Sequence, residues 1–553
     1  MVEQAPANHS DGEPKRPPPT TRWAVPATIG TALAATAGWL SAPPMGVDLA
    51  AQVARADFWA RHGGAVLDFG WYGGISPYQY SLLTPAAMAW LGGGVTGARW
   101  LGALAAVLAA ALLVLLLLRT GARRPLLGGV LGTVGIVGNL VSGRITFTVG
   151  LAFGLATLLA LTAQRRWVRR TGAIAGGVLT GAASPVAALF CGLAGVAVLL
   201  TSRSRRLDGL FIAAGSGLSI GVMSLLFGAD GPMNTIVSDT LRSVTVSLLV
   251  AVLVNRRTIR VGALLSAAGV LAAAVLETPV GLNAGRLSAT FALAVLACYA
   301  TMPDGIRLAR LPRLAQFARL PRLRPAVLPL LLVAVALWQH PVAVREVRHA
   351  GDPMASPAAF RPLLAESSRY APVGRIEVVP TGDYRETAYL ADRVPLARGW
   401  LRQADIARNP LFFDGQLTAG RYLSWLRDNG VSLVAIARGP VAPVGAQEAR
   451  LVRKREPYLT EIWRGGVWTL YRVAGAPTVL DGATLVSSTA AGITLLAPGT
   501  GDILVRLRWS DWLAARGPAA CLTPGPHGWT TLRARTPGRY TVTGSFRPGP
   551  ACR

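Results

Sequence analysis

Apolar runs of up to about twenty residues alternate with short arginine clusters along the first 340 residues of this 553-residue chain. A run of that length crosses a bilayer as a helix, because a helix satisfies all its backbone hydrogen bonds internally. The hydrophobic content of 52% and a mean hydropathy of +0.42 agree with a membrane environment. We therefore expect a polytopic α-helical membrane protein with about eleven spans, near residues 23–43, 100–118, 125–141, 145–163, 171–183, 186–201, 208–228, 236–254, 261–277, 287–302 and 325–340.

The arginine clusters occupy alternate loops, which predicts the orientation of the chain. Cytoplasmic loops of membrane proteins carry an excess of Lys and Arg. The sequence thus predicts a cytoplasmic N-terminus and an extracytoplasmic C-terminal region, with residues 1–22 as a disordered, polar and Pro-rich cytoplasmic tail. The clusters are Lys15, Arg16 and Arg22; Arg119, Arg123 and Arg124; Arg165, Arg166, Arg169 and Arg170; Arg203, Arg205 and Arg206; Arg256, Arg257 and Arg260; and the run from Asp304 to Arg324.

The formal charge of +28 would also suit a nucleic-acid-binding protein. Its distribution between apolar runs argues against that function. The five histidines are scattered, with no CxxC or HxxxH pairing, so we expect neither a metal nor another cofactor.

One apolar segment, Ser81 to Leu91, is too short to cross the bilayer, and counting it as a span would place the later arginine clusters on the wrong side. We expect this segment to form an interfacial or half-inserted helix within a first outer loop of residues 44–99. The membrane domain as a whole is expected to cover residues 23–340.

From about Pro341 the hydropathy falls and charges of both signs appear, which indicates a soluble extracytoplasmic region. Residues 341–476 mix a helical segment, 418–429, with strands VSLVAIA and VWTLYRV, which predicts an α/β domain. Residues 477–553 are rich in short strands and turns, which predicts a β-sandwich. A disulfide between Cys521 and Cys552 suits an oxidising compartment.

Charged and polar residues follow the first span on an expected helix. Asp48, Gln52 and Arg55 are spaced by four and three, so they share one helix face, and Asp57 lies close by. The alternative is an interfacial helix whose charges are simply solvated.

Two arginines, Arg144 and Arg286, lie on the outer side against the charge bias of the chain. The guanidinium fork suits a lipid phosphate, since it donates two hydrogen bonds at once. A salt bridge to a nearby acid or a snorkelling side chain is the alternative for each. Other polar residues of the outer turns are Asn139, Asp230, Asn234, Glu277 and Asn283.

An aromatic-rich turn follows, with Trp71, Tyr72 and Tyr78. Such side chains suit a sugar or a lipid headgroup, and they equally suit an aromatic belt at the membrane interface.

The segments GVDLAAQVARADFWARHG, from Gly46, and WYGGISPYQYSLLTP, from Trp71, together with many spans and a large C-terminal outer region, resemble the GT-C superfamily of membrane glycosyltransferases and an actinobacterial group of GT-C-like polytopic proteins. The resemblance implies a polyprenyl-phosphate sugar donor, a lipid or polysaccharide acceptor of the cell envelope, and a multi-pass cell-membrane location. Asp48 matches the acid that acts as general base, with Asp57 as the alternate base and Arg286 and Arg144 as the phosphate clamp.

The sequence departs from the pattern in one respect. Many GT-C relatives show a second acid beside the first, whereas Asp48 stands between Val47 and Leu49. The resemblance also implies that the outer domain binds the acceptor or covers the site. Trp400, Arg402 and Asp405 are candidates for that role, with ordinary packing as the alternative.

Two other functions fit the same architecture. A transporter would also have many Gly-rich spans, although few ionisable residues lie at mid-membrane depth here. A non-catalytic envelope-assembly protein would leave Asp48 dispensable.

Overall fold

The structure is a computed structural model that describes residues 19–228, 231–301, 324–370, 374–475, 477–547, 549 and 552. Residues 1–18 of the expected tail, Asp230 and the basic run up to residue 323 lie outside these residues. The last residues of the expected tail form a short helix, α1 (Pro19–Arg22).

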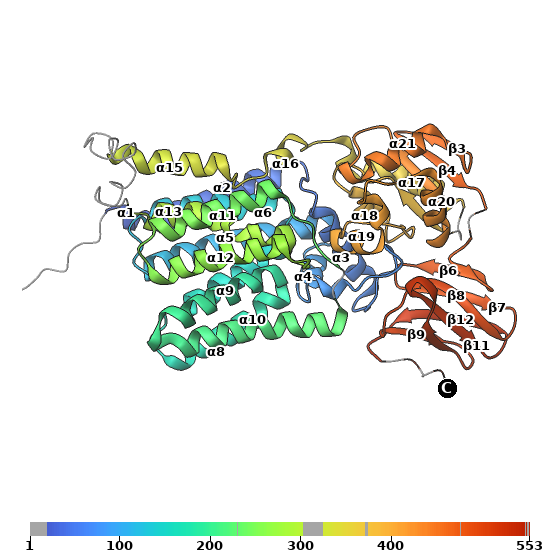
Figure 1. Cartoon of the computed structure of the whole chain (residues 1–553), viewed down its shortest axis with the longest axis horizontal. Coiled ribbons are helices and arrows are strands. Elements are labelled where there is room, and N and C mark those ends of the chain that lie inside the picture. The colour runs from blue at the N-terminus through green and yellow to red at the C-terminus, as the bar shows by residue number, and fades with distance from the viewer. Residues whose placement is uncertain are drawn as a thin grey trace, which may run out of the picture.

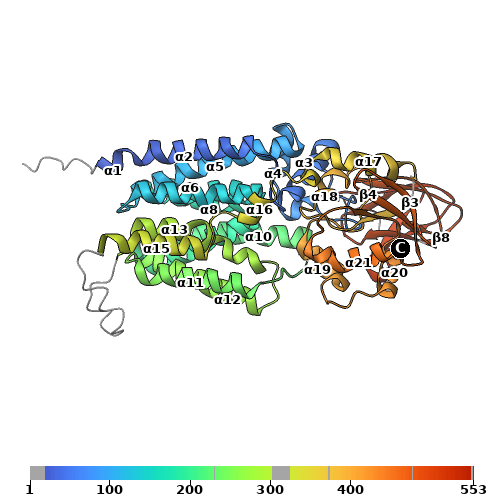
Figure 2. The same ribbon diagram turned by 90° about the horizontal axis from the view of Figure 1, so that it is seen from above.

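Each of the eleven apolar runs forms a helix, and these helices lie side by side in one bundle (Figures 1 and 2). Their ends differ from the predicted limits by a few residues, because apolar composition does not mark the caps. The helices are α2 (Ala24–Ser41), α5 (Gly94–Arg119), α6 (Pro125–Val141), α7 (Ile145–Ala160), α8 (Arg166–Ala183), α9 (Pro185–Thr201), α10 (Arg206–Phe227), α11 (Val237–Leu253), α12 (Arg257–Val275), α13 (Arg286–Tyr299) and α15 (Arg324–Trp338).

By length and composition alone, four described helical segments could cross a membrane: Gly94–Arg119, Arg203–Phe227, Arg257–Val275 and Gly281–Tyr299. Four further apolar helices are shorter: Pro125–Val141, Ile145–Ala160, Pro185–Thr201 and Ala326–Trp338. The total of about eleven spans therefore stays a prediction.

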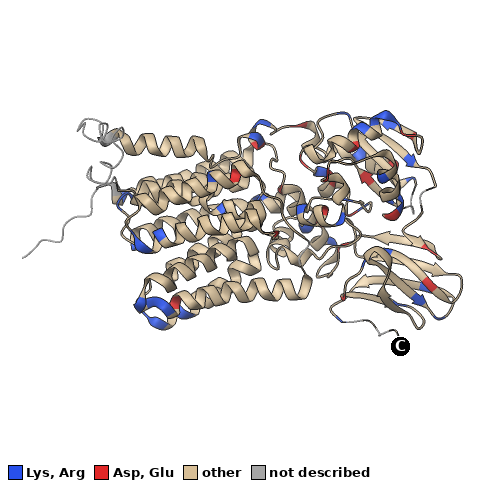
Figure 3. Cartoon of the chain, viewed as in Figure 1, with Lys and Arg blue, Asp and Glu red and all other residues tan. Residues whose placement is uncertain are grey.

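The two ends of the bundle differ in charge. Lys and Arg residues gather at the end away from the C-terminal region (Figure 3). We call the other end, which contacts the C-terminal region, the domain end.

The chain between α2 and α5, which we call the first loop, lies between the bundle and the C-terminal region (Figures 1 and 2). It contains α3 (Leu49–His62), η1 (Pro77–Gln79) and α4 (Thr84–Trp90). With seven residues, α4 is too short to cross a bilayer, as predicted for Ser81 to Leu91. Gln52 and Arg55 of α3 are only 2% and 3% exposed, so the charge of Arg55 is not simply solvated, as the alternative would require.

After α15, the short helix α16 (Val344–Arg348) leads to a four-stranded mixed sheet of order β1-β2-β4-β3. β1 (Arg375–Val378) and β2 (Val431–Ala437) are parallel, and β4 (Trp468–Val473) is antiparallel to β2 and to β3 (Leu459–Gly465). The accompanying helices are α17 (Pro357–Ser368), α18 (Arg385–Tyr389), α19 (Arg402–Arg408), α20 (Ala419–Asp428) and α21 (Ala446–Lys454).

The last part of the chain forms two antiparallel sheets, of order β10-β11-β8-β5 and β6-β7-β12-β9. Inward residues such as Leu495, Val505 and Tyr540 form a core that also takes in Leu67 and Phe69 of the first loop. The strands are β5 (Leu480–Asp481), β6 (Thr484–Thr489), β7 (Gly492–Ala497), β8 (Gly501–Arg508), β9 (Leu513–Arg516), β10 (Cys521–Pro524), β11 (Trp529–Ala534) and β12 (Gly538–Gly544).

Single 3₁₀ turns complete the described structure. They are η2 (Arg203–Arg205), η3 (Gly281–Gly285), η5 (Pro353–Ala355), η6 (Pro410–Phe412), η7 (Pro443–Gly445) and η8 (Pro526–Gly528).

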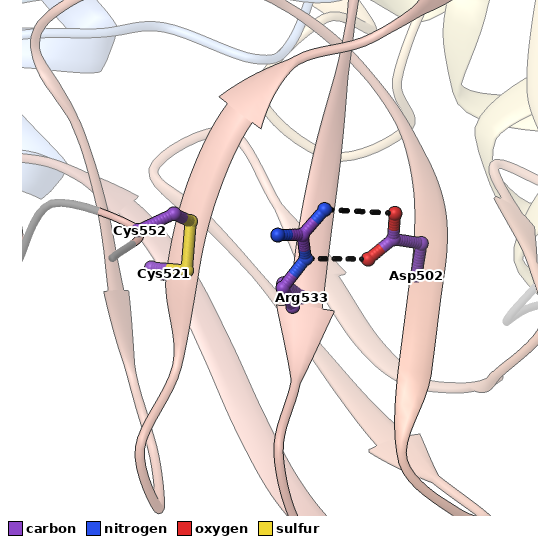
Figure 4. The surroundings of a disulfide bond; sticks show 4 residues. All are labelled: Asp502, Cys521, Arg533 and Cys552. Atoms are coloured by element: carbon purple, nitrogen blue, oxygen red, sulfur yellow. Dashed lines mark hydrogen bonds and ion pairs between the residues drawn. A yellow bond between two sulfur atoms is a disulfide. The ribbon is translucent and has the colours of Figure 1, made fainter.

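Cys521 on β10 is bonded to Cys552, which confirms the predicted disulfide (Figure 4). The bond ties the end of the chain to the sheet. Across the same sheet, Arg533 of β11 pairs with Asp502 of β8 at 2.9 Å.

We predict that replacing Cys521 and Cys552 together by Ser lowers the stability of the β-sandwich by about 3 kcal/mol, because the bond closes a loop with a sequence separation of 31 residues. The melting temperature of the detergent-purified protein measures this change. Limited proteolysis at increasing temperature shows whether residues 477–553 are the part that unfolds earlier. An unchanged melting temperature would contradict the prediction. Cys191→Ser, at a buried free thiol, is the control that leaves the β-sandwich unchanged.

Candidate active site

Three parts of the chain meet at the carboxylate of Asp48, which stands at the N-cap of α3. Its Oδ2 lies 3.3 Å from Nε of Arg144 and 3.4 Å from Nη2 of Arg286. Its Oδ1 accepts a hydrogen bond from the indole N–H of Trp400 at 3.1 Å. The first loop, the domain end of the bundle and the α/β part of the C-terminal region thus share one carboxylate.

Two glycine turns bring Asp48 and Arg144 together. Gly46 and Gly143 have φ of +93° and +77°, which side chains rarely allow. The turns are in direct contact, because the N–H of Asp48 donates to the carbonyl of Ser142 at 3.3 Å. A Cβ on Gly143 would lie 2.2 Å from the backbone N of Leu49, so only glycine permits this approach.

Arg286 reaches Asp48 from the first turn of α13. Its side chain is 10% exposed, and its guanidinium lies over the ring of Phe147 at 5.6 Å from the centroid. The Nη1 of Arg286 is buried without a hydrogen-bond partner in the structure. A buried guanidinium N–H without a partner is costly, so this group is available to an acceptor that enters the site.

The immediate charge balance of the site is positive, since two guanidinium groups face one carboxylate. Glu346 of α16 also lies near, and its carboxyl accepts a hydrogen bond from the N–H of Val47. Burial, together with the charges of Asp383 and Asp48, raises the pKa of Glu346 above its usual value. Glu346 is therefore easier to protonate than a free glutamate.

Trp400 is held rigidly against Asp48 by its neighbours. Its ring stacks on Tyr384 with centroids 3.8 Å apart, and the guanidinium of Arg402 lies 5.3 Å from the Trp400 ring. Beside it, Nη2 of Arg385 donates to the carbonyl of Gly46 at 3.3 Å. The sequence drew attention to Trp400 and Arg402 by their mixed character, whereas nothing in its pattern singled out Arg385.

Asp405, the third residue considered with them, serves the packing of the C-terminal region. Its carboxylate pairs with both Nε and Nη2 of Arg398, at 3.0 and 2.8 Å. Arg398 also contacts Glu448 at 3.1 Å. All three side chains are buried, so the hydrogen bonds between them replace contacts with water.

The expected ligand-stacking role of Trp71 and Tyr72 is wrong for this state of the protein. These side chains are 0% and 2% exposed. The indole of Trp71 donates to Asp68 at 2.8 Å, and the hydroxyl of Tyr72 donates to the carbonyl of Gly399 at 2.6 Å. The bond from Trp71 stays within the first loop, whereas the bond from Tyr72 reaches the C-terminal region. Both rings also pack in the core of the α/β part, which covers the faces that a sugar would need.

Gln52 and Arg55 are buried on α3, one and two turns beyond Asp48. The guanidinium of Arg55 lies over Tyr80, at 4.7 Å, and over Trp71, at 5.5 Å. The side-chain oxygen of Gln52 is buried without a hydrogen-bond partner. These residues support the loop that carries Asp48.

The other candidates are on α3, in the first loop, after α12 and in η3. Asp57 is nine residues along α3, on its opposite face in a helix of about 3.6 residues per turn, and it pairs with Arg61 at 3.5 Å. Burial raises the pKa of Asp57, while Arg61 lowers it. Glu277 is exposed after α12, and Asn283 is buried in η3, just before Arg286. Tyr78 lies at the domain end of α10, against Phe227.

Among the described residues, no group of three or more His, Cys, Asp or Glu side chains could hold a metal ion. The contacts of the Asp48 carboxylate described above come from two guanidinium groups and one indole.

Comparisons with known proteins give distant structural likenesses. No protein-family model and no curated protein matches the chain. Two cryo-EM structures of the arabinofuranosyltransferase AftD from Mycobacteria are similar, at 15% and 14% identity with a TM-score of 0.48 each, over 95% of this chain. This chain spans 60% and 59% of the length of those AftD chains.

ArnT from Cupriavidus metallidurans is similar over 83% of this chain and 99% of its own. The structure bound to undecaprenyl phosphate has 13% identity and a TM-score of 0.46, and the apo structure has 14% and 0.48.

We predict that Gly143→Ala lowers the stability of the protein by about 1–3 kcal/mol, because a Cβ at positive φ is strained and would contact Leu49. The thermal unfolding midpoint in lipid nanodiscs measures the change. Gly217→Ala in α10 is the matched control, since nothing lies within 4 Å of its Cβ position. Equal midpoints for the two variants would show that the contact of the glycine turns is not needed.

Proposed function

We propose that this protein is a GT-C-type membrane glycosyltransferase, which transfers a sugar from a polyprenyl-phosphate donor to a cell-envelope acceptor at the outer face of the membrane. The observation that carries the proposal is the carboxylate of Asp48, held between Arg144 and Arg286 at the domain end of the bundle. Asp48 is the general base, and the two arginines hold the lipid phosphate.

The position of Asp48 suits a base that receives a proton from an acceptor hydroxyl. The side chain is 23% exposed, so it is partly open to a substrate. Carboxylate oxygens have further lone pairs beyond those used by Arg144, Arg286 and Trp400. Because its partners come from three separate segments, the carboxylate is fixed in place before a substrate arrives, as general-base catalysis requires.

The excess positive charge suits a departing phosphate. Sugar transfer from a polyprenyl phosphate leaves a lipid-linked anion, and guanidinium groups bind phosphate oxygens through paired hydrogen bonds. Arg286 has a buried Nη1 without a partner, and Arg144 is 32% exposed. Both can therefore donate to phosphate oxygens while Asp48 remains nearby.

The orientation follows from the distribution of basic residues. The arginine clusters lie at the end of the bundle opposite the C-terminal region (Figure 3). Under the positive-inside rule that end faces the cytoplasm, so Asp48 lies at the outer leaflet. A polyprenyl-phosphate donor in that leaflet would present its phosphate at the depth of the two arginines.

We predict that Asp48→Asn abolishes glycan transfer at normal protein level, because the amide cannot accept the proton of the acceptor hydroxyl. The measurement is the cell-envelope glycan profile, with accumulated polyprenyl-phosphate sugars, in a strain that lacks the native protein. Asp57→Asn is the matched control on the same helix, and we expect it to retain transfer.

The outcomes separate the possible functions. A wild-type glycan profile with Asp48→Asn rejects the catalytic role of this carboxylate. Loss of transfer with Asp57→Asn alone would move the base to Asp57. Loss of solute uptake without a glycan change would favour a transporter instead.

We predict that Trp400→Phe lowers the transfer rate by about tenfold, because it removes one hydrogen bond to a charged group and keeps an aromatic ring. Initial rates of sugar transfer in isolated membranes, divided by the amount of folded protein, measure the effect. Trp468→Phe is the control in the same region, since it removes an indole hydrogen bond to the carbonyl of Ala359 at 2.7 Å, away from Asp48. A normalised rate that falls equally in both variants would argue against a specific role for Trp400.

A further inference from the structure

Four aromatic side chains form a cluster at the domain end of α10. Phe227, the last residue of α10, lies 5.8 Å from Tyr78 of the first loop and 6.2 Å from Trp512 of the β-sandwich, between ring centroids. Phe546, which follows β12, lies 5.5 Å from Trp512 and 6.0 Å from Tyr78. We call these four residues the aromatic cluster.

Hydrogen bonds fix the aromatic cluster to the end of α10. The indole N–H of Trp512 donates to the carbonyl of Leu226 at 2.6 Å. The amide of Gln79 donates to the carbonyl of Gly228 at 2.9 Å. These donors satisfy carbonyls that a helix end leaves without intrahelical partners. The β-sandwich and the first loop therefore both attach at this helix end.

The length of α10 places the aromatic cluster at the membrane surface. α10 has 22 residues and begins at Arg206, directly after Arg203 and Arg205. A helix of that length extends about 33 Å, and the hydrocarbon core of a bilayer is about 30 Å thick. If the arginines mark one edge of the hydrocarbon core, Phe227 lies at the other edge, in the headgroup layer.

An exposed apolar stripe on α10 leads to the aromatic cluster. Leu218, Val222 and Leu225 are 58%, 42% and 87% exposed, and their spacing of four and three puts them on one helix face. In a membrane helix such a face contacts lipid tails. Phe546 continues this apolar surface onto the β-sandwich, where its side chain is 53% exposed.

The composition of this surface suits the lipid headgroup layer. Tyr and Trp are enriched at that depth, because their rings are apolar and their polar tips bind water or headgroups. Arg547, next to Phe546, is exposed and can contact lipid phosphates, while the exposed Asp511, next to Trp512, opposes an anionic surface. Because the charges of Arg547 and Asp511 cancel, this surface would bind the membrane through insertion of aromatic side chains rather than through net charge.

We infer that the aromatic cluster inserts Phe546 into the headgroup layer of the bilayer and holds the β-sandwich against the membrane surface. The partner is the phospholipid surface itself. The attachment does not depend on the chemistry proposed for Asp48, and it fixes the height of the C-terminal region above the bilayer.

The test places an environment-sensitive NBD label at residue 546, through Phe546→Cys, in the full chain reconstituted into phosphatidylcholine nanodiscs. The native cysteines are either buried or disulfide-bonded, so the new thiol is the accessible one among the described residues. Val486→Cys is the matched control, because Val486 is 41% exposed on β6. β6 is at the opposite edge of the sheet from β9, the strand that directly follows Trp512.

We expect blue-shifted NBD emission at residue 546 and loss of most of its intensity when brominated lipids replace ordinary ones. The label at residue 486 is expected to show neither effect. Because Phe546→Cys removes one ring, Arg547→Cys provides a second label position that keeps all four aromatic side chains. Emission and quenching at residues 546 and 547 equal to those at residue 486 would overturn the inference.

Discussion

The carboxylate of Asp48 joins three parts of this protein. A partly buried charge is stable only where donors surround it, and here the donors come from the turn before α7, the start of α13 and the C-terminal region. Each donor restricts the placement of the segment that carries it. The geometry of the site and the relative position of the parts are therefore two aspects of the same set of contacts.

The first loop gives these contacts a rigid support, because it contributes to three apolar cores. Leu49 and Val53 of α3 belong to the core of the bundle, Trp71 and Tyr72 to that of the α/β part, and Leu67 and Phe69 to that of the β-sandwich. Burial of large aromatic side chains is among the strongest stabilising contributions a loop can make. The first loop can thus hold the carboxylate of Asp48 in one position.

The sequence predicted those features that depend on neighbouring residues or on the composition and length of one segment. Helix positions followed from the length of the apolar runs, and the pairing of Cys521 with Cys552 followed from the expected compartment. The grouping of Arg144 and Arg286 with Asp48 was predicted on a different basis. Their positions at turns on the same predicted side, against the charge bias, were enough to group them.

Other features depend on residues far apart in the sequence, and no local pattern contains them. The sequence around Trp71 and Tyr72 does not indicate whether the two side chains are exposed or buried. They are buried by a region that begins some 270 residues later. Arg385 and Trp400 reach the site only because the C-terminal region folds back over α3. The family resemblance had suggested Trp400 for a covering role, but the position of Arg385 could not be deduced without the tertiary structure.

The hydrogen bond from Tyr72 to Gly399 joins residues 327 positions apart. During synthesis at about 5–20 residues per second, the first loop therefore emerges on the order of tens of seconds before its covering partner. Through that interval Trp71 and Tyr72 lack the core of the α/β part and Asp48 lacks the indole of Trp400, so the segment that carries the site is covered only after the C-terminal region has been synthesised and has folded.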